Sequence, residues 1–327
     1  MVRTYQVNWL RQAIRRRTVQ YRLFGRTGWR VSSIGMGCWA LGGQWGPVPE
    51  SEAIATVHAA IDAGINLFDT ADSYGPRRSE ELLGKALGKS RRADVFIATK
   101  VGNLGRPEGH PLSYTTPEHI YVCCDASLKR LQTDHIDLYQ CHIREHPHHE
   151  VFLEAFERLL EVGKIRAYGT SSFITDEIEL FDRHNRCHVV QLPYSVLDRT
   201  YERDVLPLCA SHNIGTLIRG PLAQGVLTGK FTRDHVFDDE TRADWNSGES
   251  RTRFQARVSA AERLRPLITE ERTMAQLALA FSIARPGATC AIPGARSPEQ
   301  AIANAAAGDI SLSADELSVM DTLQLPT

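Results

Sequence analysis

Short apolar runs alternate with amphipathic segments along the chain after residue 20. Apolar runs too short for helices and bounded by glycine or polar residues predict buried strands. The predicted strands are residues 34–38, 66–69, 95–100, 136–142, 165–171, 189–192, 216–219 and 289–292. Apolar positions three and four residues apart predict helices between them. The predicted helices are residues 51–63, 79–87, 117–131, 150–161, 175–183, 199–211, 253–264 with 273–284, and 298–307.

This alternation predicts a parallel sheet, because parallel neighbours need a crossover connection and a helix supplies it. Eight such units favour a closed barrel over a doubly wound sheet, and the run GMG at 35–37 lacks the third glycine of a Rossmann nucleotide site. Residues 21–23 and 31–32 flank a glycine turn and predict a hairpin. We therefore expect an α/β fold, a (β/α)8 TIM barrel with an N-terminal β-hairpin, as a single domain spanning residues 21–327.

The first stretch of the chain departs from this regular pattern. Arginines crowd it at positions 3, 11, 15, 16 and 17, and no acidic residue occurs before Glu50. It lacks the apolar core of a secretory signal and is poor in serine for a transit peptide. We interpret residues 1–20 as an Arg-rich mobile tail, with residues upstream of the true start codon as the alternative.

The composition of the chain argues against several classes of function. The chain has 327 residues, 42% of them hydrophobic, and a formal net charge of −1, so no overall field attracts nucleic acid or an anionic membrane. No apolar run approaches the ~20 residues of a membrane span. The seven cysteines lack CxxC spacing, which is typical of reduced packing residues. We expect a cytoplasmic protein with a small-molecule substrate and no nucleic-acid or membrane partner, and we make no prediction of its oligomeric state.

Polar residues follow several predicted strands. Asp69, Lys100 and His142 end the second, third and fourth strands, and Tyr74 lies on the loop after Asp69. The carboxyl ends of barrel strands meet at one face, so these side chains can converge although they are far apart in sequence. The sequence therefore predicts an active site at this face.

These residue types suit proton transfer. A free tyrosine has a pKa near ~10, and one ammonium about 4 Å away supplies about 4 kcal/mol toward the phenolate at an effective dielectric of about 20. Lys100 could thus lower the pKa of Tyr74, Asp69 would keep Lys100 charged, and His142 could hold the oxygen that Tyr74 protonates. General acid–base help of this kind contributes about 10²- to 10⁴-fold, so positioning and a cofactor must supply the rest.

Several runs of sequence together resemble one known family. They are FDTADSYG (68–75), IATKVG (97–102), DLYQCH (137–142), GKIRAYGTSSF (163–173), QLPYS (191–195), GPLAQGVLTGKF (220–231) and IPGARSPEQAIANAAA (292–307). In this order and spacing the chain resembles the aldo-keto reductase superfamily from about residue 21 onward. The resemblance implies that Asp69, Tyr74, Lys100 and His142 form a catalytic tetrad, with Tyr74 as the general acid in carbonyl reduction.

The resemblance also implies a nicotinamide cofactor. Ser171, Ser172 and Gln191 match residues at the nicotinamide carboxamide, and Arg219 stands where many members stack a tyrosine on the ring. The segment over the pyrophosphate is implied to include Gly220, Leu222, Gln224 and Lys230. The adenosine phosphate site is implied to include Gly294, Arg296, Gln300 and Asn304.

Three positions depart from the common pattern of the family. Ser172 replaces an asparagine and has a shorter reach, Arg219 replaces the stacking tyrosine, and Ala303 removes a carboxylate from the adenosine site. A guanidinium also stacks on a π-face, so the cofactor site is expected to be kept. Arg296 is a suitable partner for a 2′-phosphate, which favours NADP(H) over NAD(H).

The substrate site is less well specified. Trp39 and Trp45 follow the first strand, and we expect one of them to line the substrate pocket. The loops after the third and fourth strands add His110, Tyr114 and Arg144. Histidines at 142, 146, 148 and 149 come without a matching set of cysteines or carboxylates, so we expect no metal site.

The predicted function is NADP(H)-dependent oxidoreduction between an aldehyde or ketone and the corresponding alcohol or sugar. One alternative enzyme is a sugar (aldose) 1-dehydrogenase that forms a lactone. An alternative of another class is a nucleotide-sensing interaction subunit resembling the potassium-channel β subunits.

Overall fold

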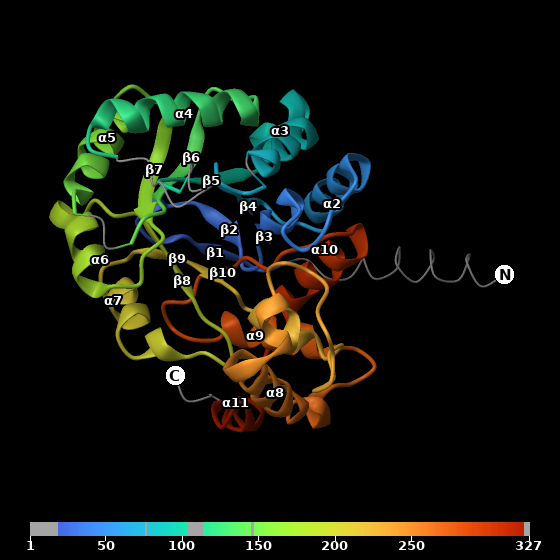
Figure 1. Cartoon of the computed structure of the whole chain (residues 1–327). Helices are drawn as coiled ribbons and strands as arrows, with labels where there is room; N and C mark the ends of the chain where they lie inside the picture. Colours follow the sequence, from blue (N-terminus) through green and yellow to red (C-terminus); the bar gives the residue numbers. More distant parts are fainter. Residues whose placement is uncertain (1–18, 76, 104–113, 145–146, 324–327) are drawn as a thin grey trace.

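A ring of parallel strands surrounded by helices forms the body of the protein (Figure 1). The computed structural model describes residues 19–75, 77–103, 114–144 and 147–323. The predicted tail, apart from residues 19 and 20, therefore lies outside the described residues. The strands of the ring are β3 (Met36–Gly37), β4 (Leu67–Asp69), β5 (Phe96–Val101), β6 (Ile136–Cys141), β7 (Ile165–Thr170), β8 (Val189–Pro193), β9 (Gly215–Arg219) and β10 (Cys290–Ala291).

The strands pair in chain order from β3 to β10, and every pair is parallel. Parallel bridges from Ile34 to Ala291 and from Gly37 to Gly294 join the first strand to the last. These bridges close the ring, so the prediction of a (β/α)8 barrel is confirmed. A closed ring leaves no free sheet edge.

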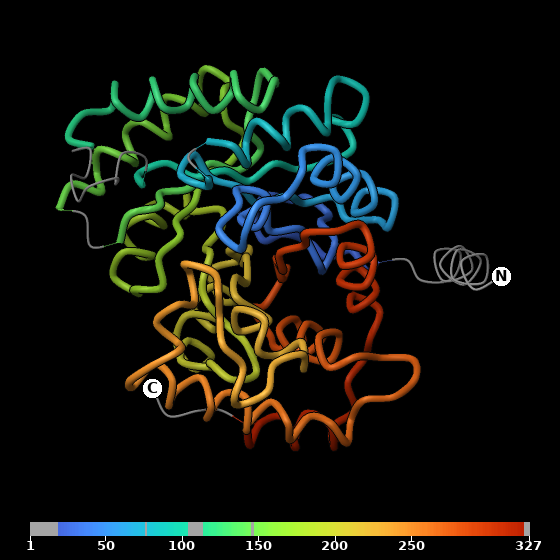
Figure 2. Tube along the Cα trace, turned by 45° about the vertical axis from the view of Figure 1, so that its right-hand side comes forward, coloured from blue at the N-terminus to red at the C-terminus, as the bar shows by residue number. Residues whose placement is uncertain are grey.

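Helices cover the outside of the strands. They are α2 (Glu50–Asp62), α3 (Arg78–Arg91), α4 (Pro117–Leu131), α5 (His149–Glu161), α6 (Thr175–Phe181), α7 (Val205–Ser211), α8 (Gly248–Glu262), α9 (Met274–Ser282), α10 (Pro298–Ala305) and α11 (Ala314–Asp321). The late helix α10 packs against the early helix α2, and both views show them side by side (Figures 1 and 2). The helical layer therefore closes at the same place as the sheet.

Two helical regions differ from the prediction. Helix α11 was not predicted, although Ser313 and Glu316 form a capping box at its start, a signal that sequence alone carries. The stretch 220–252, predicted to be irregular, contains the 3₁₀ helices η7 (Ala223–Thr228) and η8 (Ala243–Asn246) and the start of α8. The stretch is rich in glycine and polar residues, and a short 3₁₀ helix has no hydrophobic periodicity. The sequence pattern therefore did not predict these elements.

The predicted hairpin closes the amino end of the barrel. Strand β1 (Tyr21–Leu23) pairs antiparallel with β2 (Arg30–Ser32). Phe24 at the turn is fully buried in a cluster with interior residues of the strands, including Leu138 and Leu217. A Cβ on Gly215 would come within 2.8 Å of the Phe24 ring, so glycine is needed there. The hairpin thus seals the base and leaves the carboxyl end for the site.

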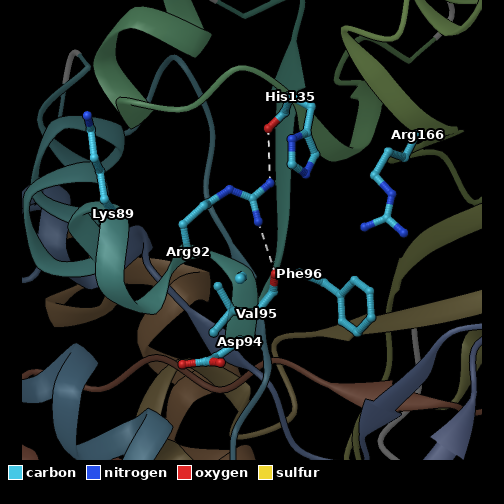
Figure 3. Close-up of a pocket in the computed structure, with 8 residues that line it drawn as sticks. Lys89, Arg92, Asp94, Val95, Phe96, His135 and Arg166 are labelled. Atoms are coloured by element: carbon cyan, nitrogen blue, oxygen red, sulfur yellow. Dashed lines mark hydrogen bonds between the residues drawn. The ribbon is translucent and has the colours of Figure 1, made fainter.

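A buried carboxylate ties the base together. Asp137 has no exposed surface, and its Oδ2 accepts hydrogen bonds from Arg92 Nη2 at 2.8 Å and from the Ile97 amide at 2.9 Å. Its Oδ1 accepts one from Arg166 Nη1 at 2.6 Å. Arg92 also donates to the carbonyls of Val95 and His135 across a surface pocket (Figure 3). Because the arginines of this pocket are already paired, we interpret it as part of the barrel's support.

Two general features bear on the predicted environment. All seven cysteines are buried and unpaired, as expected for reduced packing residues. Within the described ranges, no helix is both long and apolar enough to cross a bilayer.

Replacing Asp137 by asparagine is expected to lower the free energy of unfolding by about 3 kcal/mol, because it leaves partly buried guanidinium groups without their counter-charge. Denaturant unfolding followed by circular dichroism measures the change. Asp134→Asn is the control, since the Asp134 side chain is 95% exposed and should change stability by less than about 0.5 kcal/mol. Equal losses in the two variants would contradict the assigned role of Asp137.

Candidate active site

A buried lysine lies at the carboxyl end of the barrel. Lys100 on β5 has no exposed surface, and its Nζ donates to Asp69 Oδ2 at 2.7 Å and to the Thr70 carbonyl at 2.7 Å. The same Nζ lies 2.9 Å from the Tyr74 hydroxyl. These contacts use the three donors of an ammonium group, so Lys100 is fixed in one position.

Two further side chains complete this arrangement. Gln191 in the middle of β8 donates from Nε2 to Asp69 Oδ1 at 2.7 Å, so the second carboxylate oxygen is also held. The ring of His142, just after β6, meets the ring of Tyr74 edge-on with centroids 6.1 Å apart. The structure therefore brings Asp69, Tyr74, Lys100 and His142 to one point, as the sequence predicts, and adds Gln191 beneath them.

The pKa of Tyr74 differs from the expectation. Burial raises the pKa of Tyr74 above its usual value, and Asp69 adds to the rise, whereas Lys100 and Arg219 act in the opposite direction. The prediction that Lys100 alone would lower the pKa of Tyr74 is therefore wrong in its net direction, because the loss of hydration outweighs one ammonium. Burial opposes the charge of Lys100, yet Asp69 and Tyr74 outweigh it and raise the pKa of Lys100. Near neutral pH the site holds a phenol beside an ammonium.

The two serines after β7 lie in different surroundings. Ser171 is 8% exposed, and its amide donates to the Cys141 carbonyl at 2.8 Å, which keeps it at the strand end beside β6. Ser172 is fully buried, and its hydroxyl donates to Glu177 on α6. The Ser172 hydroxyl is thus engaged by a helix residue, and a role of Ser172 at the cofactor stays a prediction.

The segment after β9 turns sharply over the barrel. Gly220 has φ +65°, and no atom lies within 4 Å of where its Cβ would be. Leu222 packs partly buried against the core, while Gln224 is exposed with φ 55° and its carbonyl accepts from Arg242 Nη1 at 3.3 Å. The positive φ values at Ala223, Gln224 and Gly225 make a tight turn, suited to a close approach of the backbone to a ligand.

Cations gather where this segment meets the last strand. Burial lowers the pKa of Lys230, and Arg242 and Arg296 lower it further, while Asp239 partly compensates. Asp239 is paired with Arg242 at 2.7 Å. The group therefore carries an excess of positive charge, which is the environment that phosphate groups of a nucleotide require.

Amide side chains hold the backbone around Arg296. Gln300 Oε1 accepts from the Arg296 amide at 2.9 Å, and Asn304 Nδ2 donates to the Gly294 carbonyl at 3.2 Å. The helix α10 begins at Pro298, as the spacing of these residues predicts. Arg296 Nη2 donates to the Pro47 carbonyl at 3.3 Å, whereas its Nε is buried and has no hydrogen-bond partner among the described residues. An unpaired buried guanidinium donor fits an anionic ligand.

Comparison with known proteins identifies the family. A profile of the Aldo/keto reductase family matches residues 33–324. The chain is 36% identical over 288 residues to aldo-keto reductase YhdN of Bacillus subtilis (strain 168), covering 86% of each chain. It is 33% identical over 315 residues to the NADH-specific methylglyoxal reductase of Escherichia coli (strain K12), covering 90% of this chain and 95% of the relative.

The chain belongs to the aldo/keto reductase family.

Solved structures agree with this assignment. The glycerol dehydrogenase AKR11B4 from Gluconobacter oxydans superposes with a TM-score of 0.80 at 30% identity, over 94% of both chains. An aldo/keto reductase from Klebsiella pneumoniae in complex with NADP and acetate superposes with a TM-score of 0.71 at 30% identity, over 94% of this chain and 95% of the other. The protein is thus an oxidoreductase of the aldo-keto reductase type.

The two predicted pocket tryptophans of this aldo-keto reductase touch each other. The rings of Trp39 and Trp45 meet edge-on with centroids 4.9 Å apart, and the Arg242 guanidinium lies 4.5 Å from the Trp45 ring. Thr241 donates to the Gln44 carbonyl at 2.8 Å, so the long loop after β9 reaches the loop after β3. A role of either tryptophan in the substrate pocket stays a prediction.

The other two candidates for substrate binding differ in outcome. Tyr114 is fully buried and packs near Phe152, so it does not offer a surface to the substrate. His110 lies outside the described residues, so its role stays a prediction. Among the residues that the structure describes, no group of three His, Cys, Asp or Glu side chains could hold a metal ion.

Sequence reasoning missed one titratable group of the reductase. Asp72 is fully buried beside the tetrad, and no described side chain donates a hydrogen bond to its carboxylate. Burial and the nearby charge of Glu80 raise the pKa of Asp72 to about 7, although Arg130, Lys100 and the Ser73 amide oppose the rise. The motif FDTADSYG contains this residue, but nothing in the motif shows that its carboxyl lacks a compensating partner.

Asp72 is expected to make stability depend on pH. Its folded pKa lies above its unfolded pKa, so the folded protein binds the extra proton and stability falls as the pH rises between these values. Relative to Asp72→Asn, the wild type should lose about 2 kcal/mol of unfolding free energy between about pH 5 and about pH 8. Denaturant titrations at both pH values measure this difference. A constant difference between the two proteins would show that Asp72 does not titrate in this range.

Proposed function

We propose that this aldo-keto reductase reduces an aldehyde or ketone with NADPH, and that Tyr74 is its general acid. One observation carries the proposal: the buried Nζ of Lys100 contacts both Asp69 Oδ2 and the Tyr74 hydroxyl. A lysine that contacted only a carboxylate would have a structural role. A lysine that also touches a phenol stabilises the phenolate that remains when the phenol gives up its proton.

Each side chain has one task in this proposal. When bound, NADPH supplies the hydride that the carbonyl carbon accepts. Tyr74 donates its proton to the carbonyl oxygen, which gives the alcohol and leaves a phenolate beside Lys100. Asp69 and Gln191 keep Lys100 in place, and His142 borders the position of the oxygen. The raised pKa of Tyr74 suits this direction, because the phenol stays protonated at neutral pH until it is used.

The charged groups support NADP(H) as the cofactor, with NAD(H) as the weaker alternative. Lys230, Arg242 and Arg296 give an excess of positive charge, and the Arg296 Nε is a buried donor suited to a phosphate oxygen. The Klebsiella pneumoniae structure contains NADP, whereas the Escherichia coli relative is named as NADH-specific. We assign Arg296 to the 2′-phosphate, and Ser171, Gln191 and Arg219 to the neighbourhood of the nicotinamide.

The reverse reaction on an alcohol or sugar is the second candidate. The similar Gluconobacter oxydans structure is named as a glycerol dehydrogenase. Oxidation needs Tyr74 as a phenolate base, and its raised pKa makes this direction favoured only at alkaline pH. Lactone formation from an aldose would use the same groups.

Tyr74→Phe is expected to lower kcat for NADPH-dependent reduction of a generic aldehyde by about 10²- to 10⁴-fold, because the proton donor is lost. NADPH binding, followed by nucleotide fluorescence, should stay within about threefold of the wild type. Tyr21→Phe is the control, since the Tyr21 hydroxyl donates to Gly64 at the surface and should leave kcat unchanged. Full turnover in Tyr74→Phe would refute the assignment of the general acid.

Arg296→Ala is expected to weaken NADPH binding by about tenfold or more, because one charge-assisted contact to phosphate is worth about 1.5–3 kcal/mol. NADH lacks the 2′-phosphate, so its Kd should change by less than about threefold. Arg91→Ala is the control, because Arg91 pairs with Asp62 near the base of the barrel. Equal weakening of NADPH and NADH binding would show that Arg296 does not contact the 2′-phosphate.

A further inference from the structure

Two arginines share one aromatic ring beside the tetrad. The Arg144 guanidinium carbon lies 4.7 Å from the centre of the Phe173 ring, and that of Arg219 lies 5.8 Å from the same ring. The ring of Tyr201 packs on Phe173 with centroids 4.6 Å apart. Arg144 follows β6, Phe173 follows β7, Tyr201 lies after β8, and Arg219 ends β9. Four loops or strand ends therefore bring these residues together.

Neither arginine of this pair has an ion-pair partner within the part of the chain that the structure describes, which leaves out residues 145 and 146. Burial lowers the pKa of Arg219, Tyr74 opposes this effect, and Arg144 lowers the pKa further, while Tyr201 and Asp198 act in the same direction as Tyr74. Asp198 is held by the Thr200 hydroxyl at 2.8 Å. Two like charges held near each other on one ring cost free energy unless an anion joins them.

The pair lies next to the reacting groups. Arg219 is close enough to Tyr74 to affect its pKa, and Arg144 follows His142 by two residues along the chain. Arg219 is half-buried and Arg144 is exposed, so the charge extends from the tetrad toward solvent. Phe173 and Tyr201 add a partly buried apolar surface along the same path. Because Arg219 acts on Tyr74 and shares the Phe173 ring with Arg144, the far end of a ligand with its carbonyl at Tyr74 is expected near Arg144.

From this placement we infer that Arg144 and Arg219, which both contact the Phe173 ring, form a subsite for an anionic group of the carbonyl substrate. The inference rests on the proposed reductase function and names its substrate class: aldehydes or ketones with a carboxylate or phosphate away from the carbonyl. A guanidinium binds both groups through paired charge-assisted hydrogen bonds. Arg144 is the specificity residue, because Arg219 is also assigned to the nicotinamide.

The test compares matched substrates with NADPH. Butanal is paired with 4-oxobutanoate, and glyceraldehyde with glyceraldehyde 3-phosphate, so that the carboxylate and the phosphate are tested separately. We expect kcat/KM to favour at least one anionic member by about tenfold or more, mainly through KM, and less at high salt. Arg144→Met should remove about tenfold of this preference and leave turnover of the neutral aldehydes and NADPH binding unchanged.

Two variants control for the loss of a charge. Arg144→Lys keeps the charge without the planar fork and should retain part of the preference. Arg253→Met removes an exposed arginine, 72% exposed and near Glu249, and should retain all of it.

The outcomes separate the two claims. If the wild type reduces none of the four substrates, the proposed function fails. If it reduces the neutral and anionic members equally well, the anionic subsite is refuted while the function stands. A preference that survives in Arg144→Met would show that the anionic group binds elsewhere.

Discussion

Burial of the Lys100 ammonium is the constraint on which the carboxyl face of the barrel depends. A buried charge is tolerated only with an opposite charge and a full set of hydrogen bonds, and Asp69, the Thr70 carbonyl and Tyr74 supply them. These partners come from β4 and the loop after it, while Gln191 on β8 holds the carboxylate from across the barrel. The energetic need to satisfy one ammonium therefore fixes the relative positions of several strand ends.

The two ends of the barrel are built on opposite principles. At the base, the hairpin inserts Phe24 among the interior side chains, and Arg92 and Arg166 are both paired with Asp137. At the carboxyl end, Arg144 after β6 and Arg219 at the end of β9 have no ion-pair partner among the described residues. Paired charges at one end contribute stability, whereas unpaired charges at the other are available for ligands.

Positive charge on the carboxyl face is local, because the whole chain carries a formal net charge of −1. Lys230 and Arg296 are assigned to the phosphates of the nucleotide, Arg219 is assigned to both the nicotinamide and the substrate, and Arg144 is assigned to the substrate. Cations within a low-dielectric site raise the local concentration of anions and strengthen each charge-assisted contact. Both the proposed cofactor preference and the proposed substrate class follow from this uneven distribution of charge.

The sequence by itself determined the barrel and the meeting of Asp69 with Tyr74, because strand periodicity and position at a strand end are local properties of the chain. Tertiary structure alone decided the net rise in the pKa of Tyr74, the engagement of the Ser172 hydroxyl by Glu177, and the placement of Arg144 on Phe173. Each of these depends on burial or on a distance between residues remote in sequence. Desolvation and Coulomb energy vary with those quantities, and no local pattern of residues encodes them.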